Sequence, residues 1–132
     1  MTGTPDPQIA LGVQNTLATY AHALDDGRTD DIVALFTPDG VSDILGMGTF
    51  EGHDALRTAY SGLVPQQPQR HLVTNTVVTP TGTDEARADS DFILVLRGET
   101  GWAVQVVGKY QDVLRRDGGV WRFTSRKTSF AM

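Results

Sequence analysis

The chain has 132 residues, of which 39% are hydrophobic and 20% charged, with a net charge of −5 and no cysteine. This length and composition predict one globular, cytoplasmic domain over residues 1–132, in which residues 1–5 form a loose tail. The weak negative charge argues against nucleic acid as a partner, no apolar run is long enough to cross a membrane, and the lack of cysteine excludes a disulfide framework and a thiolate nucleophile.

A long amphipathic helix is predicted at the start of the chain. Asp6 precedes Pro7, which suits a helix N-cap followed by proline at the first helical position. Gly27 suits the end of the helix, because glycine readily adopts the left-handed conformation found there. Apolar side chains between these ends form one stripe at helical spacing: Ile9, Val13, Leu17, Tyr20 and Leu24.

Two shorter helices and a hairpin are predicted next. Thr29 can cap a second helix, which ends before a Pro-Asp-Gly turn at residues 38–40. A short hairpin then pairs residues 41–45 with residues 49–51 around a glycine-rich turn. A third helix is expected over residues 54–61.

The second half of the chain carries four long strand patterns separated by turn residues. They cover residues 70–79, 86–97, 102–116 and 120–130. Successive antiparallel pairing is the simplest connection between them. Helices followed by such a sheet predict an α+β fold, in which a long, bent antiparallel sheet is filled on its concave side by the first helix.

Strict alternation along these strands predicts which side chains share a face of the sheet. His71 and Asn75 fall on one face of the first long strand, and Asn75 could either contact a pocket or hydrogen-bond within the sheet. Trp102 and Tyr110 share a face of the third strand and could line a pocket or the core. Gly108 between them suggests a bend or bulge.

Two consecutive acids at the end of the first helix are unusual. A carboxylate there costs about 0.3–1 kcal/mol when exposed, because the C-terminal end of a helix carries a partial negative charge. We therefore expect Asp25 or Asp26 to have a compensating partner, for which His71 is the candidate. The alternative is that both acids are solvated at a fraying helix end.

Three separated motifs occur in order along the chain. They are Y-A-H-A-L-D-D-G-R-T-D-D-I-V-A-L-F-T-P-D-G from residue 20, F-E-G-H-D-A-L-R from residue 50 and R-H-L-V-T-N from residue 70. Together they resemble the nuclear-transport-factor-2-like (NTF2-like) superfamily, and within it the SnoaL-like branch that includes scytalone dehydratase and bile-acid 7α-dehydratase. The resemblance implies a cone, in which a curved antiparallel sheet wraps around a helix and encloses an apolar pocket.

The resemblance also assigns working groups. In the dehydratases these are a tyrosine and an aspartate on the first helix and a histidine on the first long strand, which Tyr20, Asp25 and His71 match. Of the two acids, Asp25 is favoured over Asp26 because it falls at the position of the dehydratases' aspartate.

Further matches are weaker. A second pocket group would fall at Ser90 or Asp91, of which Asp91 could substitute for the missing second histidine of scytalone dehydratase. Arg126 could match the C-terminal arginine of the bile-acid enzyme or lie on a solvated strand end. The catalytic base of ketosteroid isomerase would fall at Ile44, which argues against that enzyme's chemistry. The candidate substrate-binding residues are thus Asn75, Asp91, Trp102, Tyr110 and Arg126.

These residue types suit proton transfer next to a carbonyl group. A histidine can move a proton near neutral pH, an aspartate bonded to its ring can orient it, and a tyrosine in an apolar pocket can donate to an oxygen that gains charge. The three histidines have no metal-ligand spacing, so we expect neither a metal nor a cofactor.

The leading functional hypothesis is a cofactor-independent dehydratase or isomerase. Its substrate would be a small-to-medium apolar, cyclic hydroxy-carbonyl compound of steroid or polyketide type. The alternatives are a non-catalytic ligand-binding or assembly domain, a polyketide cyclase, and an epoxide hydrolase that holds a water between Asp25 and Asn75. Relatives of this kind form dimers or trimers, so a homo-oligomer is expected.

Overall fold

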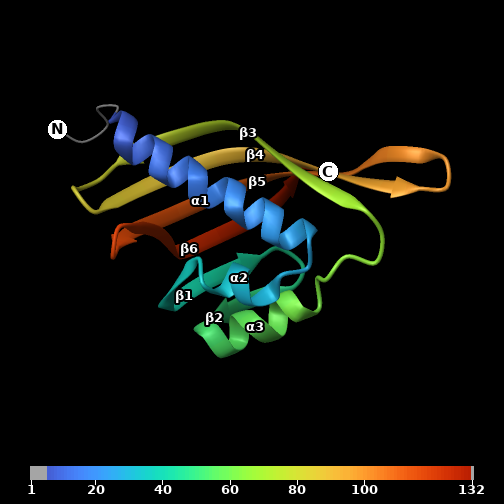
Figure 1. Ribbon diagram of the computed structural model, residues 1–132, viewed down its shortest axis with the longest axis horizontal. Coiled ribbons are helices and arrows are strands. Elements are labelled where there is room, and N and C mark those ends of the chain that lie inside the picture. The colour runs from blue at the N-terminus through green and yellow to red at the C-terminus, as the bar shows by residue number, and fades with distance from the viewer. Residues whose placement is uncertain (1–5, 132) are drawn as a thin grey trace.

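The computed structural model describes residues 6–131, so the predicted tail at residues 1–5 lies outside the described residues. Three helices precede or interrupt a six-stranded sheet (Figure 1). The elements are α1 (Pro7–Asp25), α2 (Thr29–Val33), β1 (Phe36–Ile44), β2 (Gly48–Glu51), α3 (His53–Ser61), β3 (Gln69–Pro80), β4 (Glu85–Gly98), β5 (Gly101–Asp117) and β6 (Val120–Ala131).

The α1 helix begins and ends where its sequence predicts. The Asp6 carboxylate accepts hydrogen bonds from the backbone N–H groups of Gln8 and Ile9 at 3.0 and 3.3 Å, which caps the helix. The predicted apolar stripe is buried along one side of the helix. That side faces the sheet, across which α1 lies (Figure 1). Thr29, in contrast, is the first residue of α2 rather than its cap.

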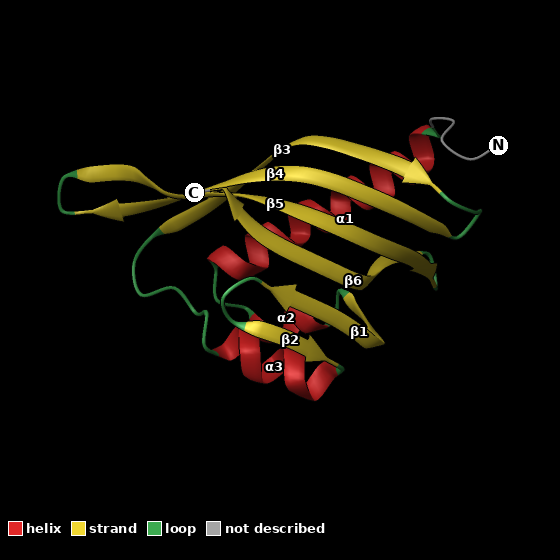
Figure 2. Cartoon of the chain, turned by 180° about the vertical axis from the view of Figure 1, so that it is seen from behind, coloured by secondary structure: helices red, strands yellow, loops and turns green. Residues whose placement is uncertain are grey.

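The sheet is curved and does not close into a barrel. Its strand order is β2-β1-β6-β5-β4-β3, and the four long strands form the predicted antiparallel meander. The β1 strand pairs parallel with β6 and antiparallel with β2, which extends the meander beyond its last strand (Figure 2). This arrangement is the predicted α+β fold, with the N-terminal helices on the concave side of the sheet.

The Pro-Asp-Gly segment at residues 38–40 is not the predicted turn but part of β1. Its pairing with β6 is interrupted between Phe36 and Val41, where the register shifts. This irregular stretch accommodates Pro38, which has no backbone N–H to donate to a neighbouring strand. Turn-forming residues therefore mark an irregularity within the strand instead of ending it.

A bulge in β3 changes the predicted alternation. Asn75 adopts a left-handed conformation with φ of 55°, and the pairing with β4 shifts between Thr74 and Val77. One extra residue in a strand moves the following side chains to the opposite face. The prediction that Asn75 shares the face of His71 is therefore wrong.

A second bulge lies in β5. Leu94 of β4 pairs with Val106, whereas the next residue of β4 pairs with Val104, which leaves Gln105 without a partner. The prediction that Trp102 shares a face with Tyr110 is wrong for this reason. Trp102 lies on the outer face of the sheet and is 51% exposed.

Gly108 permits a close approach rather than the predicted bend, because the strand pairing continues without a shift on both sides of it. The ring of Phe92 lies over its backbone. A Cβ atom at this position would also lie only 2.6 Å from the backbone oxygen of Ser129. No larger residue fits here unless the sheet or the aromatic core moves.

We expect Gly108→Ala to lower the free energy of unfolding by about 1–3 kcal/mol, because the backbone of a central sheet cannot move away from the added methyl group. Gly82→Ala is the control, since its Cβ would have no neighbour within 4 Å. Urea denaturation measures both. Equal stability of the two variants would contradict the steric role of Gly108.

Candidate functional site

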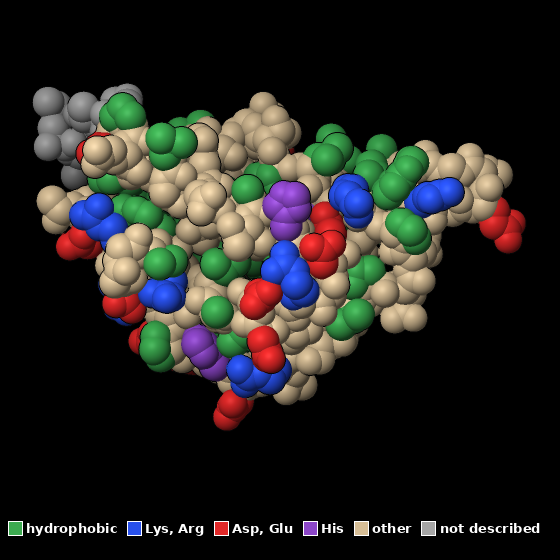
Figure 3. Space-filling model, in the orientation of Figure 1, with side chains coloured by type: hydrophobic (Ala, Val, Ile, Leu, Met, Phe, Trp, Pro, Cys, Tyr) green, Lys and Arg blue, Asp and Glu red, His purple; other side chains and the backbone are tan. Residues whose placement is uncertain are grey.

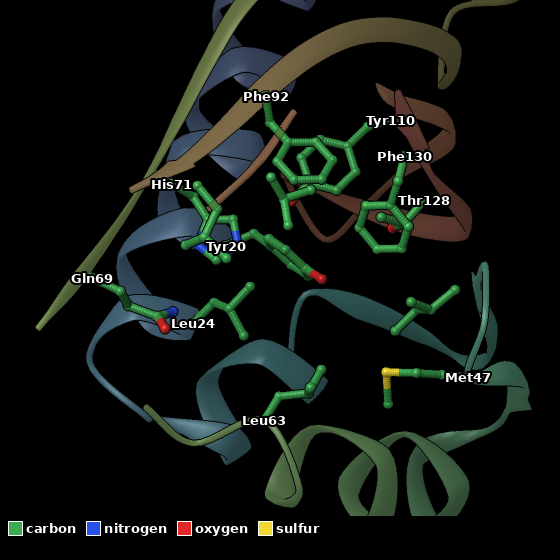
Figure 4. Close-up of a pocket in the computed structure, with 13 residues that line it drawn as sticks. Tyr20, Leu24, Met47, Leu63, Gln69, His71, Phe92, Tyr110, Thr128 and Phe130 are labelled. Atoms are coloured by element: carbon green, nitrogen blue, oxygen red, sulfur yellow. The ribbon is translucent and has the colours of Figure 1, made fainter. Parts of the chain in front are cut away.

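An apolar cavity of about 220 Å³ lies between the C-terminal half of α1 and the concave face of the sheet. Figure 4 shows its lining side chains converging from the helix, the sheet and the segment after α3. The lining residues are Tyr20, Leu24, Ile44, Met47, Leu63, Gln69, His71, Phe92, Leu94, Val106, Tyr110, Thr128 and Phe130.

Asp25 and His71 meet at the edge of this cavity. Asp25 is the last residue of α1, and its Oδ1 lies 2.6 Å from Nδ1 of the His71 ring on β3. Its Oδ2 accepts the His71 backbone N–H at 2.8 Å. The His71 and Asp25 side chains are only 9% and 6% exposed. Two bonds from one carboxylate therefore fix both the backbone and the ring of His71 and leave its Nε2 free of Asp25.

The contacts of Asp25 explain why a carboxylate is tolerated at the end of a helix. Partial burial by itself raises its pKa, but the bonds from the ring and backbone of His71 and from Gln69 Nε2 at 3.1 Å lower the pKa below its usual value. Asp25 is therefore ionised at neutral pH. Asp26, by contrast, is exposed and approaches Arg28 at 3.5 Å.

Three buried hydroxyl groups form a chain that reaches the cavity. The Tyr20 hydroxyl lies 2.7 Å from that of Tyr60, which lies 2.9 Å from the Ser42 hydroxyl. In Figure 4 the Tyr20 hydroxyl points into the cavity, away from α1. Burial raises the pKa of both tyrosines, so both stay protonated and can donate.

Sequence reasoning missed Tyr60 and Ser42 as members of the site. Tyr60 follows Leu56 by one helical turn, a spacing that indicates packing as readily as a polar role. Ser42 lies in a short strand with no distinguishing motif. Both residues are identified by a polar side chain that is only 0–1% exposed, and that burial can be seen only in the folded chain.

Aromatic side chains form another wall of the cavity. Phe92 stacks on Tyr110 with 4.4 Å between ring centroids and lies 5.9 Å from the His71 ring. Tyr110, which was predicted to bind substrate, therefore lies in the cavity wall. Its pKa is raised by burial, so this hydroxyl is protonated as well.

Three other predicted substrate-binding residues lie outside the cavity. Asn75 donates to Asp91 at 2.9 Å, and Asp91 pairs with Lys109 at the same distance on the outer face of the sheet. Ser90, not Asp91, faces the interior and is 1% exposed. Trp102 lies on the outer face because of the bulge at Gln105 in β5. None of the three reaches the Asp25–His71 pair.

Arg126 does not lie on a solvated strand end and does not line the cavity. Its side chain is fully buried, and its Nε donates to Asp112 at 3.0 Å. The guanidinium lies behind the rings of Tyr20 and Tyr110, with its Cζ 4.2 and 3.4 Å from their centroids. A direct contact between Arg126 and a ligand in the cavity is thus prevented by the tyrosines.

Within residues 6–131, no three His, Asp or Glu side chains gather closely enough to hold a metal ion. No helix in this range combines the length and hydrophobicity needed to span a membrane. On the face shown in Figure 3, acidic and basic side chains are mixed rather than gathered into a basic patch.

Solved structures share this architecture over nearly the whole chain. A candidate aromatic-ring hydroxylase from Novosphingobium aromaticivorans is 27% identical, with a TM-score of 0.85 over 98% of this chain and 93% of its own. A candidate scytalone dehydratase from the same organism is 20% identical, with a TM-score of 0.82 over 93% and 84%. A protein from Catenulispora acidiphila in complex with S-DNPA is 24% identical, with a TM-score of 0.84 over 95% of each chain.

The family assignment rests on the sequence as well as on the fold. No curated protein sequence matches the chain. Another similar structure, from Nostoc punctiforme, is described as having a cystatin-like fold, and one from Novosphingobium aromaticivorans as an NTF2-like protein with that fold. The family model of the SnoaL-like domain matches residues 10–127. The chain therefore belongs to the SnoaL-like domain family and has its NTF2-like fold.

Proposed function

We propose that this protein is a cofactor-independent dehydratase or isomerase that acts on a small, cyclic hydroxy-carbonyl compound. The observation that carries the proposal is the 2.6 Å contact between Asp25 and His71 at the edge of an apolar cavity that the Tyr20 hydroxyl enters. The arrangement combines a histidine, an ionised group that orients it and a hydrogen-bond donor beside a largely apolar cavity.

In the proposed dehydration, His71 Nε2 takes a proton from the carbon next to the carbonyl group. The electron pair of the broken C–H bond moves toward the carbonyl oxygen, which accepts a hydrogen bond from Tyr20. The electron pair then returns, a C=C bond forms and the β-C–O bond breaks. The imidazolium gives its proton to the departing hydroxyl, so that water leaves and His71 is neutral again. Return of the proton to a different carbon would give an isomerase instead.

Asp25 keeps its negative charge throughout this sequence. It holds Nδ1 of the His71 ring, which directs Nε2 toward the substrate, and it stabilises the positive charge that the ring gains. The chain of Ser42, Tyr60 and Tyr20 supports the donor role of Tyr20. If each hydroxyl donates to the next, the proton of Tyr20 is directed toward the cavity.

The size of the cavity favours a substrate of one or two rings. Pockets for drug-sized ligands commonly occupy about 300–1,000 Å³, whereas this cavity occupies about 220 Å³. A polyketide-type aromatic precursor is therefore a better match than a steroid. The 27% identical relative described as a candidate aromatic-ring hydroxylase is consistent with ring compounds of this size.

The alternative functions have less support. An epoxide hydrolase of the expected kind needs Asp25 and Asn75 to hold a water together, but Asn75 bonds to Asp91 on the other face of the sheet. A non-catalytic binding or assembly domain, or a polyketide cyclase, could use the same cavity. The contact between Asp25 and His71 favours proton transfer over binding alone.

We also propose that the chain acts in the cytoplasm as a homo-oligomer. Apolar side chains gather on the outer face of β3, β4 and β5, where Leu72, Trp102, Val104 and Val107 are each 42–63% exposed. The strand pairing brings these residues together on one surface. A second copy of this chain is the occupant we propose, because a self-complementary sheet face would cover the patch on both copies.

His71→Ala should lower turnover about 10²–10⁴-fold, the usual range for loss of a general acid–base group. The assay follows dehydration of a hydroxytetralone to the corresponding naphthol by absorbance, within a panel of one- and two-ring β-hydroxy ketones. His22→Ala, at an exposed position on α1, is the control. Near-full activity of His71→Ala on a substrate that the wild type turns over would contradict the proposed role.

Asp25→Asn should flatten the acid dependence of stability. Because the pKa of Asp25 is lowered in the folded state, the unfolded state binds the proton first as the pH falls. The stabilisation is therefore complete above about pH 4, the unfolded value, and is lost below it. Melting temperatures between neutral and acid pH measure this loss, with Asp26→Asn as the control. A variant profile that parallels the wild type would show that Asp25 is not held as an anion.

Val104→Arg should shift the protein toward the monomer in analytical ultracentrifugation, because it places a charge in the outer apolar patch. Val120→Arg is the control, at a valine that is likewise exposed, 42% against 63% for Val104, but lies at the β5–β6 turn. A wild type that is monomeric at all concentrations would contradict the proposed assembly.

A further inference from the structure

The pair formed by Arg126 and Asp112 is buried beyond what its hydrogen bonds can satisfy. Both side chains are 0% exposed and share one bond of 3.0 Å, from Nε to Oδ1. Asp112 Oδ2 and both Nη atoms of Arg126 have no hydrogen-bond partner among the described residues. Buried polar atoms without a hydrogen-bond partner are rare in folded proteins, so each of these three needs an explanation.

Stability alone is a weak explanation for this pair. Burying two charges costs more free energy than one bond returns, and well-packed apolar residues often replace buried pairs at no loss. The β5 and β6 strands are in any case joined by a continuous ladder in which Asp112 and Arg126 are direct partners. The position of the charges offers a better account.

The guanidinium of Arg126 lies against the rings of the cavity tyrosines. Its Cζ lies 3.4 Å from the ring centroid of Tyr110 and 4.2 Å from that of Tyr20. Phe123 closes a third side at 4.7 Å. The cation thus contacts the back of two side chains whose other surfaces line the cavity.

We propose that Arg126 is a positioning residue that acts through Tyr20 and Tyr110, and that its buried charge makes their hydroxyls stronger hydrogen-bond donors to a substrate oxygen that gains negative charge. This assignment rests on the proposed function, because it concerns the oxyanion formed in that reaction. It replaces the direct substrate contact that the sequence suggested for Arg126.

The physical basis is electrostatic. A cation over the face of a phenol ring draws electron density from it and favours the anionic form of its oxygen, and the low dielectric of the interior strengthens the effect. Burial raises the pKa of Tyr20, Tyr60 and Tyr110, and in each case Arg126 opposes that rise. The Asp112 carboxylate acts in the opposite sense on Tyr60 and Tyr110, but more weakly than Arg126.

The pair remains charged under physiological conditions. Burial raises the pKa of Asp112 to about 6, with Arg126 opposing the rise, so the carboxylate is ionised at neutral pH. Burial alone would lower the pKa of Arg126, but Asp112 and the tyrosines raise it overall. The charge is therefore held behind the cavity wall, where it can act on the substrate while the cavity itself stays apolar.

The chain has three tyrosines, and Tyr60 and Tyr110 both lie next to Tyr20, so every tyrosine can report on the charge of Arg126. Difluorotyrosine replaces them, because fluorine makes the phenol more acidic and provides a fluorine NMR signal for each site. Tyr20→Phe, Tyr60→Phe and Tyr110→Phe assign the signals. The pKa of each fluorotyrosine is then measured in the free protein, without any ligand.

Two variants should shift these pKa values in opposite directions. Asp112→Asn removes the opposing anion and should lower the pKa at Tyr110. The double variant Arg126→Met with Asp112→Leu, which removes both charges, should raise the pKa at Tyr20 and Tyr110 by about one pH unit or more, the usual effect of a charge within ~4–6 Å. Lys109→Met, which removes a cation from the outer face of β5, should leave both unchanged.

Shifts of opposite sign in the two variants would support the proposal. Unchanged values, or shifts of the same sign, would overturn it, since loss of packing alone has no reason to depend on the sign of the charge removed. Melting curves identify the variants that fold. If only one of them folds, the sign of its pKa shift at Tyr110 decides: a fall is expected for Asp112→Asn and a rise for the double variant. The measurement needs no turnover, so a failure of the proposed dehydration would be seen separately, in the assay of His71→Ala.

Discussion

The Asp25 carboxylate connects two parts of the chain that are 46 residues apart, and the geometry of the cavity depends on that connection. One oxygen bonds to the ring of His71 and the other to its backbone, so the end of α1 is fixed to the start of β3. Without these bonds the helix end would carry an uncompensated charge and the ring of His71 could rotate. The same two bonds therefore serve the packing of the helix on the sheet and the orientation of the proposed catalytic group.

The cavity combines this polar edge with largely apolar walls. Tyr20 contributes to both the polar edge and the apolar walls, because its ring packs in the aromatic core while its hydroxyl enters the cavity. The charged groups nearest to it, Arg126 and Asp112, lie behind the wall. A substrate would thus meet hydrogen-bond donors and one histidine in a setting of low dielectric, which strengthens each electrostatic interaction inside it.

The sequence predicted the fold and part of the site. The ends of the first helix and the positions of the long strands followed from local signals that the tertiary structure preserves, whereas the choice of Asp25 as the partner of His71 followed from the resemblance to the dehydratases. Asn75 and Trp102 were placed wrongly because a β-bulge reverses alternation, and neither bulge has a strong sequence signal at its own position. Tyr60, Ser42 and the burial of Arg126 depend on packing between distant segments, which periodicity within one segment cannot report.

The parallel pairing of β1 with β6 has a consequence for how the chain folds. Apart from its hairpin partner β2, Phe36–Ile44 pairs only with Val120–Ala131, so the β1–β2 hairpin cannot join the rest of the sheet before β6 is in place. Ile44, Thr128 and Phe130 from these strands all line the cavity. During synthesis, therefore, the cavity cannot form until β6 has left the ribosome, and the backbone groups along the β5 edge of the growing sheet stay unpaired until then.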